Sequence, residues 1–309
     1  MDHTQRTLKE SVGCTGVGLH SGERVHLTIK PAASNTGIRF VRTDLPDRPS
    51  VRACFENVVD TTLATTLGVN GCRVCTVEHV LAALFGLGID NAVIELDGAE
   101  VPIMDGSAAP FVFLLKSAGI LQQSAPKNFI VIRKPFKVDD GARSVEIHPS
   151  RELKITYTIE FDHPLVRSQH FSLNFSGKDF VREISKARTF GFLKDVQMLK
   201  DNGFAKGGSL DNAVVIDDNH VLNEDGLRYK DEFVRHKILD FIGDLSVLGC
   251  PVIGHFVVNK SGHFLNHLML REFKKATDHW KLLSVEHPET ERRERFKVPA
   301  FWLPEPAAA

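Results

Sequence analysis

The most constraining feature of this sequence is segment 231–248, where apolar residues recur with the 3.6-residue period of an α-helix. In it, His236, Asp240 and Asp244 recur every four residues, so their side chains share one helix face. The positions between them are apolar enough to bury most of the remaining surface: Phe233, Ile238, Leu239, Phe241, Ile242, Leu245, Val247 and Leu248. A carboxylate on a buried helix is costly unless a cation compensates it. That cation is either a metal ion or the protonated imidazole of His236, and the helix alone favours neither.

Composition narrows the class of protein. The 309 residues are enough for two domains of ordinary size. The net charge is −1 and no Lys/Arg tract is present, which argues against nucleic-acid binding and against docking on anionic membranes. No apolar run approaches a membrane span, so stable membrane insertion is not expected. Five cysteines, an odd number, favour a reduced cytoplasmic protein, which we expect to be a monomer.

Strand and helix patterns occur in two sets, and the polar, proline-containing stretch 121–128 between them is the best candidate for a linker. The first set contains the strongest short hairpin signal, Asn70–Gly71, between two strand patterns. A helix follows, for which Thr76 is the expected N-cap and Gly88 the expected end. Strands, a glycine-interrupted helical stretch and the helix described above form the second set. The sequence therefore predicts an α+β fold.

The two sets resemble each other weakly. Segments 78–96 and 235–256 each place a histidine at a helix start, then a glycine, then an apolar strand. This pattern indicates two copies of one α+β unit, although the identities are few enough for coincidence to remain an alternative. We accordingly predict an N-terminal domain at 1–124 and a C-terminal domain at 125–309.

A real repeat would make His79 and His236 equivalent, and two facing copies would bring both to the domain interface. His79 lies in the first turn of its helix, where the helix dipole favours the neutral imidazole that binds metals. Glu78 points about 100° away around the helix, towards a water on the metal rather than the metal itself. We therefore predict that His79, His236 and Asp240 hold zinc with one open position, and that Glu78 accepts the water's proton. Taken alone, His79 is better explained as a surface histidine at a helix end.

Longer motifs carry a family resemblance. They are TGVGLHSG (15–22), TVEHVLAALFGLGIDN (76–91), PIMDGSAAPF (102–111), ARTFGF (187–192), VLNEDGLRYKDEFVRHKILDFIGDL (221–245) and KSGHFLN (260–266). In these motifs, and in their order, the chain resembles the UDP-3-O-acyl-N-acetylglucosamine deacetylases, the zinc amidases of lipid A biosynthesis. The resemblance implies two similar β-α-α-β sandwich domains with helices packed inward, a small insert in each, and an active site in the cleft between them. It also implies removal of the N-acetyl group of UDP-3-O-acyl-N-acetylglucosamine, the committed step of that pathway.

The resemblance assigns the zinc ligands and the general base to the residues named above and adds three catalytic positions. His263 matches the general acid that protonates the leaving amine. Asp244 matches the carboxylate that orients this histidine, which would also raise the pKa of the imidazole. Thr189 matches a hydroxyl that helps to hold the tetrahedral oxyanion.

Substrate contacts follow from the same comparison. Lys237 and Phe190 match positions around the sugar nucleotide. His20 also matches a histidine near the substrate, although an ordinary turn histidine is the simpler interpretation. A β-α-β insert, about 192–215, would form the passage for the acyl chain. The insert residues expected to contact the substrate are Phe192, Val196, Leu199, Ala205 and Val214.

Other interpretations remain open. Cys72 and Cys75 form a lone CxxC on a strand, where their side chains point to opposite faces, so we interpret the pair as structural. The metal could clamp two domains without catalysis, or it could serve a zinc hydrolase of a different N-acyl substrate.

Overall fold

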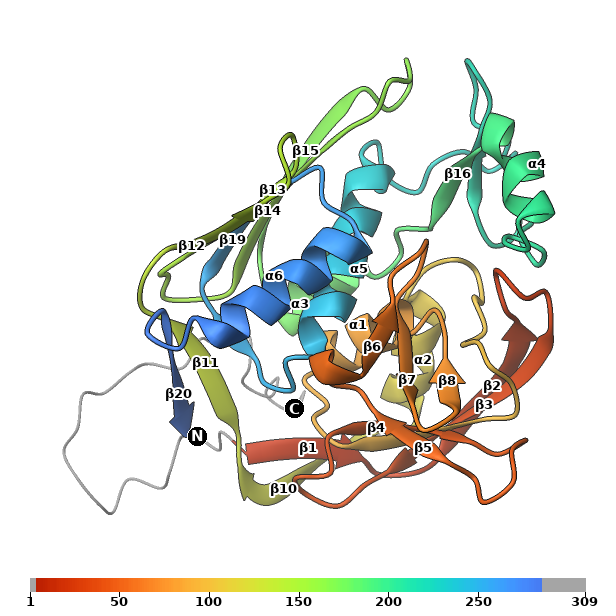
Figure 1. Ribbon diagram of the computed structural model, residues 1–309. Coiled ribbons are helices and arrows are strands. Elements are labelled where there is room, and N and C mark those ends of the chain that lie inside the picture. Colours follow the sequence, from red (N-terminus) through yellow and green to blue (C-terminus); the bar gives the residue numbers. More distant parts are fainter. Residues whose placement is uncertain (1–3, 285–309) are drawn as a thin grey trace, which may run out of the picture.

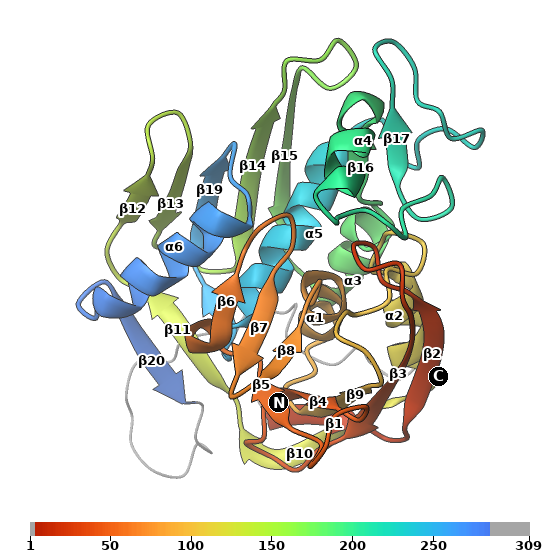
Figure 2. The same cartoon turned by 45° about the vertical axis from the view of Figure 1, so that its right-hand side comes forward.

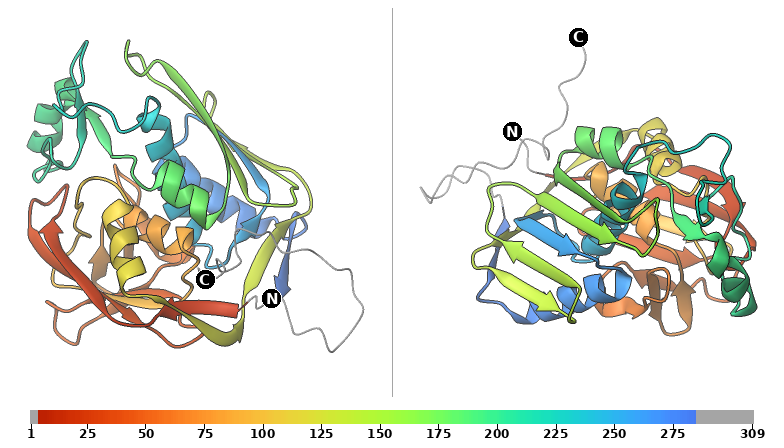
Figure 3. Two further views of the ribbon diagram at one scale, coloured as in Figure 1. Left: turned by 180° about the vertical axis from the view of Figure 1, so that it is seen from behind. Right: turned by 90° about the horizontal axis from the view of Figure 1, so that it is seen from above.

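The structure is a computed structural model that describes residues 4–284. Two five-stranded sheets form outer layers of the molecule, and the long helices lie between them (Figures 1 and 3). The fold is therefore α+β, as the sequence predicts.

The first sheet has the strand order β2-β3-β9-β4-β5. Its strands are β2 (Val12–Val17), β3 (Arg24–Pro31), β9 (Ala92–Leu96), β4 (Ile38–Arg42) and β5 (Ser50–Arg52). Neighbouring strands are antiparallel, except that β4 and β9 are parallel. On β3 the apolar residues Val25, Leu27 and Ile29 are buried, because alternate side chains of a strand point to one face.

The second sheet repeats this arrangement, with the order β12-β13-β19-β14-β15 and only β14 and β19 parallel. Its strands are β12 (Phe136–Asp139), β13 (Ser144–His148), β19 (His255–Asn259), β14 (Lys154–Glu160) and β15 (Ser168–Asn174). In each sheet the middle strand is the last of the five in the sequence, and it follows a buried helix. The topology thus confirms the internal repeat that the sequence shows weakly.

Two helices, α1 (Glu78–Gly86) and α5 (Glu232–Ser246), pack against each other between the sheets (Figure 2). Two more, α2 (Ala109–Ser117) and α6 (His263–Lys275), lie beside them. Every residue of α1 is buried. A Cβ atom on Gly243 would lie 2.2 Å from the carbonyl oxygen of Glu78, so a glycine is needed for this close helix contact. No helix within the described residues is long and apolar enough to cross a membrane.

Smaller elements complete the fold. The remaining strands are β1 (Thr4–Leu8), β6 (Val58–Asp60), β7 (Thr66–Val69), β8 (Cys72–Val74), β10 (Ile120–Pro126), β11 (Asn128–Ile132), β16 (Phe190–Phe192), β17 (Val214–Ile216), β18 (Val252–Ile253) and β20 (Trp280–Ser284). The remaining helices are the short η1 (Phe55–Asn57), α3 (Gly177–Asp179), the π-helical turn η2 (Phe180–Ile184) and α4 (Leu193–Asp201). Strands β7 and β8 pair through the predicted hairpin, in which Asn70 and Gly71 have φ angles of 46° and 80°.

Two local predictions are wrong. The stretch 121–128 is not a linker, because β10 covers most of it and pairs with β1. Thr76 does not cap α1: the residue before the helix is Val77, and Thr76 has a φ of 57° with its hydroxyl bonded to Glu100. Gly88, with a φ of 68°, follows the helix end as expected.

Candidate active site

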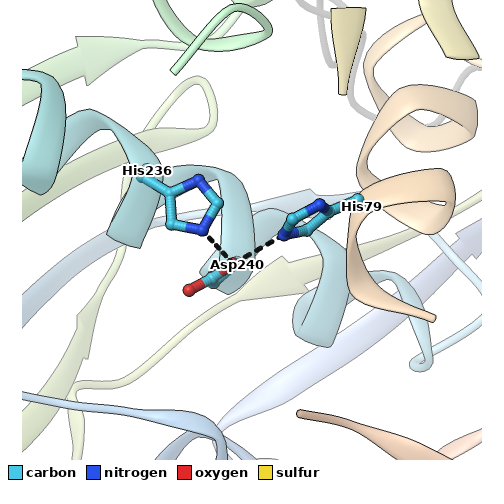
Figure 4. Close-up of side chains that lie close together, drawn as sticks. All are labelled: His79, His236 and Asp240. Atoms are coloured by element: carbon cyan, nitrogen blue, oxygen red, sulfur yellow. Dashed lines mark ion pairs between the residues drawn. The ribbon is translucent and has the colours of Figure 1, made fainter. Parts of the chain in front are cut away.

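Side chains from the two central helices meet in one buried cluster (Figure 4). His79 comes from the first turn of α1, while His236 and Asp240 lie one turn apart on α5. Oδ1 of Asp240 lies 3.2 Å from Nε2 of His236 and 3.6 Å from Nε2 of His79. In the described part of the chain, no other group of three His, Cys, Asp or Glu side chains brings its ligand atoms within 4.8 Å of one another. The two histidines thus converge, as the repeat predicts.

The cluster has the dimensions of a zinc site. Donors that bind zinc tetrahedrally at about 2.0–2.2 Å are separated from one another by roughly 3.3–3.6 Å. The separations of 3.2 and 3.6 Å fall close to this range. Imidazole nitrogen and carboxylate oxygen are both ordinary zinc donors, so the three residues fit the ion.

The surroundings of His236 favour a metal ligand over an ion pair with Asp240. Its Nδ1 is 3.0 Å from the carbonyl oxygen of Ala187 and donates to it, which leaves Nε2 facing Asp240. Burial lowers the pKa of His236 to about 3, so the ring is neutral and Nε2 carries a lone pair. A lone pair and a carboxylate oxygen at this distance repel unless a cation lies between them. Second contacts of this kind, from the other ring nitrogen to a carbonyl, are typical of metal-binding histidines.

Glu78 lies beside this cluster without joining it. Its Oε2 accepts a hydrogen bond of 3.1 Å from the backbone N–H of Thr65, and its Oε1 lies 3.8 Å from Nε2 of His263. The side chain is buried, and burial raises the pKa of Glu78. A carboxylate with a raised pKa accepts a proton readily near neutral pH, which suits a general base.

His263, the first residue of α6, faces Glu78 across the site. Its Nδ1 donates to Oδ2 of Asp244 over 2.8 Å, and Asn266 donates to the same oxygen. Burial alone would lower the pKa of His263, but the carboxylates of Asp244, Glu78 and Asp240 together outweigh it and raise the pKa to about 9. The imidazole is therefore protonated at neutral pH and able to act as an acid.

Thr65 contacts both Glu78 and Asp244, and the sequence gives no sign of these contacts. Its hydroxyl donates to Oδ1 of Asp244 over 2.6 Å, while its backbone N–H binds Glu78. One buried residue thus holds both the carboxylate behind His263 and the candidate base. Thr65 and Asp244 lie 179 positions apart in the sequence, so helical spacing gives no signal for this pair.

We expect the substitution Thr65→Val to lower kcat about ten- to a hundredfold, because a hydrogen bond to a charged group contributes about 1.5–3 kcal/mol. Valine keeps the shape and the backbone N–H but leaves Oδ1 of Asp244 without its donor. Steady-state kinetics of Thr65→Val and Thr65→Ser decide the matter, because serine retains the hydroxyl. Equal kcat values for the two variants would show that the hydroxyl has no part in turnover.

A cavity of about 350 Å³ lies over the cluster. Glu78, His263 and the three candidate ligands contribute to its wall. Four of the residues assigned by resemblance also line it: His20, Thr189, Phe190 and Lys237. Arg143, which the sequence did not single out, lines it as well. One cavity therefore collects side chains from both halves of the chain.

The predicted passage residues lie outside this cavity lining. Phe192 ends strand β16, and its ring centroid is 5.6 Å from that of Phe161 and 5.1 Å from that of His163. These rings form an aromatic cluster beside Phe190 rather than a wall above the candidate ligands.

The insert spans β16, α4 and β17, and the other four predicted residues lie in it after Phe192. Val196 and Leu199 are half-buried on α4, and Val214 is fully buried in β17. Ala205 lies in the connection between them, and its N–H points to Nδ1 of His20 over 3.4 Å. The insert thus reaches back to the turn that precedes β3.

Comparison with known proteins shows the family of this chain. The family model for UDP-3-O-acyl N-acetylglycosamine deacetylase matches residues 5–275. The UDP-3-O-acyl-N-acetylglucosamine deacetylase of Myxococcus xanthus is 55% identical over 289 residues, covering 94% of this chain and 92% of the relative. That of Methylococcus capsulatus is 55% identical over 284 residues, covering 91% and 93%. That of Marinobacter nauticus is 53% identical, covering 93% and 95%. The chain belongs to the UDP-3-O-acyl-N-acetylglucosamine deacetylase family.

Proposed function

We propose that this chain hydrolyses the N-acetyl amide of UDP-3-O-acyl-N-acetylglucosamine to the free amine and acetate, the committed step of lipid A biosynthesis. One observation carries the proposal: a single cavity combines a three-residue ligand set with a candidate base and a candidate acid. The names of the relatives support the choice of substrate.

The ligand set His79, His236 and Asp240 is assigned to Zn²⁺. Two imidazoles and a carboxylate suit this ion, and three protein ligands leave one position open, as in catalytic zinc sites. When bound, zinc would lower the pKa of a water molecule to about 7 and polarise the acetyl carbonyl. The second carboxylate oxygen of Asp240 accepts from Lys237 over 2.8 Å, which keeps Oδ1 directed towards the two histidines.

Glu78 is assigned as the general base. Its Oε1 takes a proton from the water that attacks the acetyl carbon, while the N–H of Thr65 fixes Oε2. Thr189 lines the same cavity, and its hydroxyl would donate to the carbonyl oxygen as that oxygen becomes negative. As the new C–O bond forms, Glu78 thus accepts the proton and the hydroxyl of Thr189 stabilises the negative charge.

His263 is assigned as the general acid. When the C–N bond breaks, the nitrogen leaves as an amine only if it gains a proton, and Nε2 of His263 supplies it. Asp244 holds Nδ1 and so directs Nε2 into the cavity, 3.8 Å from Oε1 of Glu78. Base and acid therefore lie next to each other, so that the water can contact Glu78 while the substrate nitrogen contacts His263.

The substrate is assigned to the cavity and the neighbouring insert. Lys237, Phe190 and His20 would contact the sugar nucleotide, because they line the wall around the ligand set. The acyl chain would follow the insert, with Phe192, Val196, Leu199, Ala205 and Val214 as candidate wall residues. Support comes from the connection of the insert, which lies against the turn that carries His20: the N–H of Gly207 donates to the carbonyl of Leu19 over 3.0 Å.

Two broader expectations stay proposals. The division into domains 1–124 and 125–309 is supported by the repeated sheet topology. A cytoplasmic location is supported by the cysteines, all five of which are free.

The substrate assignment is tested by offering acylated and unacylated UDP-N-acetylglucosamine side by side and measuring acetate release. We expect kcat/KM for the acylated compound to be higher by at least about a hundredfold, because each buried CH₂ contributes about 0.8 kcal/mol. Equal values would contradict an acyl passage. Absence of acetate release from either compound would contradict the proposed reaction.

A further inference from the structure

The polar face of α5 begins one turn earlier than the candidate ligands. Glu232, the first residue of the helix, lies four positions before His236 and so shares a face with His236, Asp240 and Asp244. Its side chain is 0% exposed, yet it takes no part in the reaction proposed above. A carboxylate buried this completely is costly, so its partners define its purpose.

Those partners are Arg188, in the segment that follows η2, and Arg228, in the loop that leads into α5. Oε1 of Glu232 accepts from the backbone N–H and from Nε of Arg188, both over 2.9 Å. Oε2 accepts from Nη2 of Arg188 over 3.2 Å and from the backbone N–H of Arg228 over 2.6 Å. The guanidinium of Arg188 also donates to the carbonyl of Gly226 over 2.6 Å. The pair is buried and both carboxylate oxygens are satisfied.

Arg188 lies between two residues of the candidate site. Before it, the carbonyl of Ala187 accepts the hydrogen bond from Nδ1 of His236. After it, Thr189 lines the cavity, with its backbone N–H bonded to Gly106. The position of Arg188 therefore sets the position of both neighbours, because the three residues share one short stretch of backbone.

We propose that the Arg188–Glu232 pair is a positioning element: it fixes the Ala187 carbonyl that aims the His236 imidazole at the metal, and it holds Thr189 at the reacting carbonyl. The inference rests on the proposed function, since it requires a metal on His236. Stability alone is a weak explanation, because apolar side chains of similar volume often stabilise a core as well as a buried ion pair does. A forked guanidinium–carboxylate pair adds direction, which a ligand shell requires.

Zinc affinity of Glu232→Gln, measured by competition with a chromophoric chelator, tests the inference. Glutamine keeps the volume and one acceptor oxygen but loses the charge and the fork. We expect zinc to bind about ten- to a hundredfold more weakly, as when other outer contacts of metal ligands are lost. We also expect kcat to fall while KM stays within about twofold, because Thr189 acts on the transition state rather than on bound substrate.

Two further variants complete the experiment. Arg188→Lys keeps the charge but lacks the planar fork whose two nitrogens each meet one carboxylate oxygen, so we expect the same losses to a smaller extent. Glu183→Gln is the matched control. It removes the carboxylate to which Nη1 of Arg235, on α5, donates over 2.7 Å, and it leaves residues 187–189 unchanged. We expect wild-type zinc affinity and kcat for the control.

The outcomes separate clearly. Folded Glu232→Gln with wild-type zinc affinity and kcat overturns the inference, and if that variant does not fold, the same result for Arg188→Lys overturns it. An equal loss of zinc affinity in Glu183→Gln also overturns it, because the loss would then follow from the removal of any ion pair on α5. Failure of the wild-type protein to bind zinc would overturn the proposed function itself, and is read from the same titration.

Discussion

Replacing Glu78 by glutamine is expected to lower kcat about a hundred- to ten-thousandfold, the usual contribution of a positioned general base. Glutamine has nearly the same volume and can still accept the N–H of Thr65, but it cannot take a proton from the attacking water. The side chain is buried and contributes no ligand atom to the metal cluster, so metal content and melting temperature should stay close to wild type. Kinetics, metal analysis and thermal unfolding of the same preparation provide the three measurements.

This substitution also separates the alternatives that the sequence leaves open. A protein in which the metal only clamps the two halves has no turnover to lose, so wild type and Glu78→Gln would be equally inactive. A hydrolase of another N-acyl substrate would lose that other activity instead. Wild-type kcat in Glu78→Gln, with metal retained, would show that another group takes the proton.

The second large effect is expected for His263→Gln, which should lower kcat by about a hundred- to ten-thousandfold because the amine then leaves without its proton donor. The imidazole lies at the start of α6 and is not a candidate ligand, so the variant should bind zinc like the wild type. Asn266→Ala is a useful companion, because it removes one donor to Asp244 while leaving the acid in place. A smaller loss in this companion than in His263→Gln would agree with the assigned roles.

The pH profile gives His263→Gln a second readout. His263 acts as an acid only while protonated. Against the effect of burial, the carboxylates of Asp244, Glu78 and Asp240 raise its pKa to about 9. The wild-type rate is therefore expected to fall as the pH rises through about 9, because the protonated fraction falls there. His263→Gln should lack this basic limb, since no proton donor remains to titrate. A variant with the same limb as the wild type would assign the limb to another group.

Much of the site could be predicted because it lies on one helix. His236, Asp240 and Asp244 need only the helical period to be placed on one face, and the structure places them there. His79 needed the internal repeat as well, since nothing within its own helix points to α5. The repeat is shown by the two sheets, whose strands follow the same order and directions.

Other features depend on contacts that no local pattern shows. Thr65 joins Glu78 and Asp244 through the tertiary structure alone. Thr76 has the composition of an N-cap, but Glu100 captures its hydroxyl and the backbone takes a positive φ instead. Polarity and a proline at 121–128 indicate a linker, yet most of this stretch is strand β10, because it pairs with β1.

Metal content and turnover of the wild-type protein, before and after chelation, test the central claim most directly. The claim is that α1 and α5 together hold one catalytic zinc ion. We expect one zinc per chain, loss of acetate release when a chelator removes it, and recovery on addition of one equivalent of zinc. Full turnover by a protein that carries no metal would contradict the account.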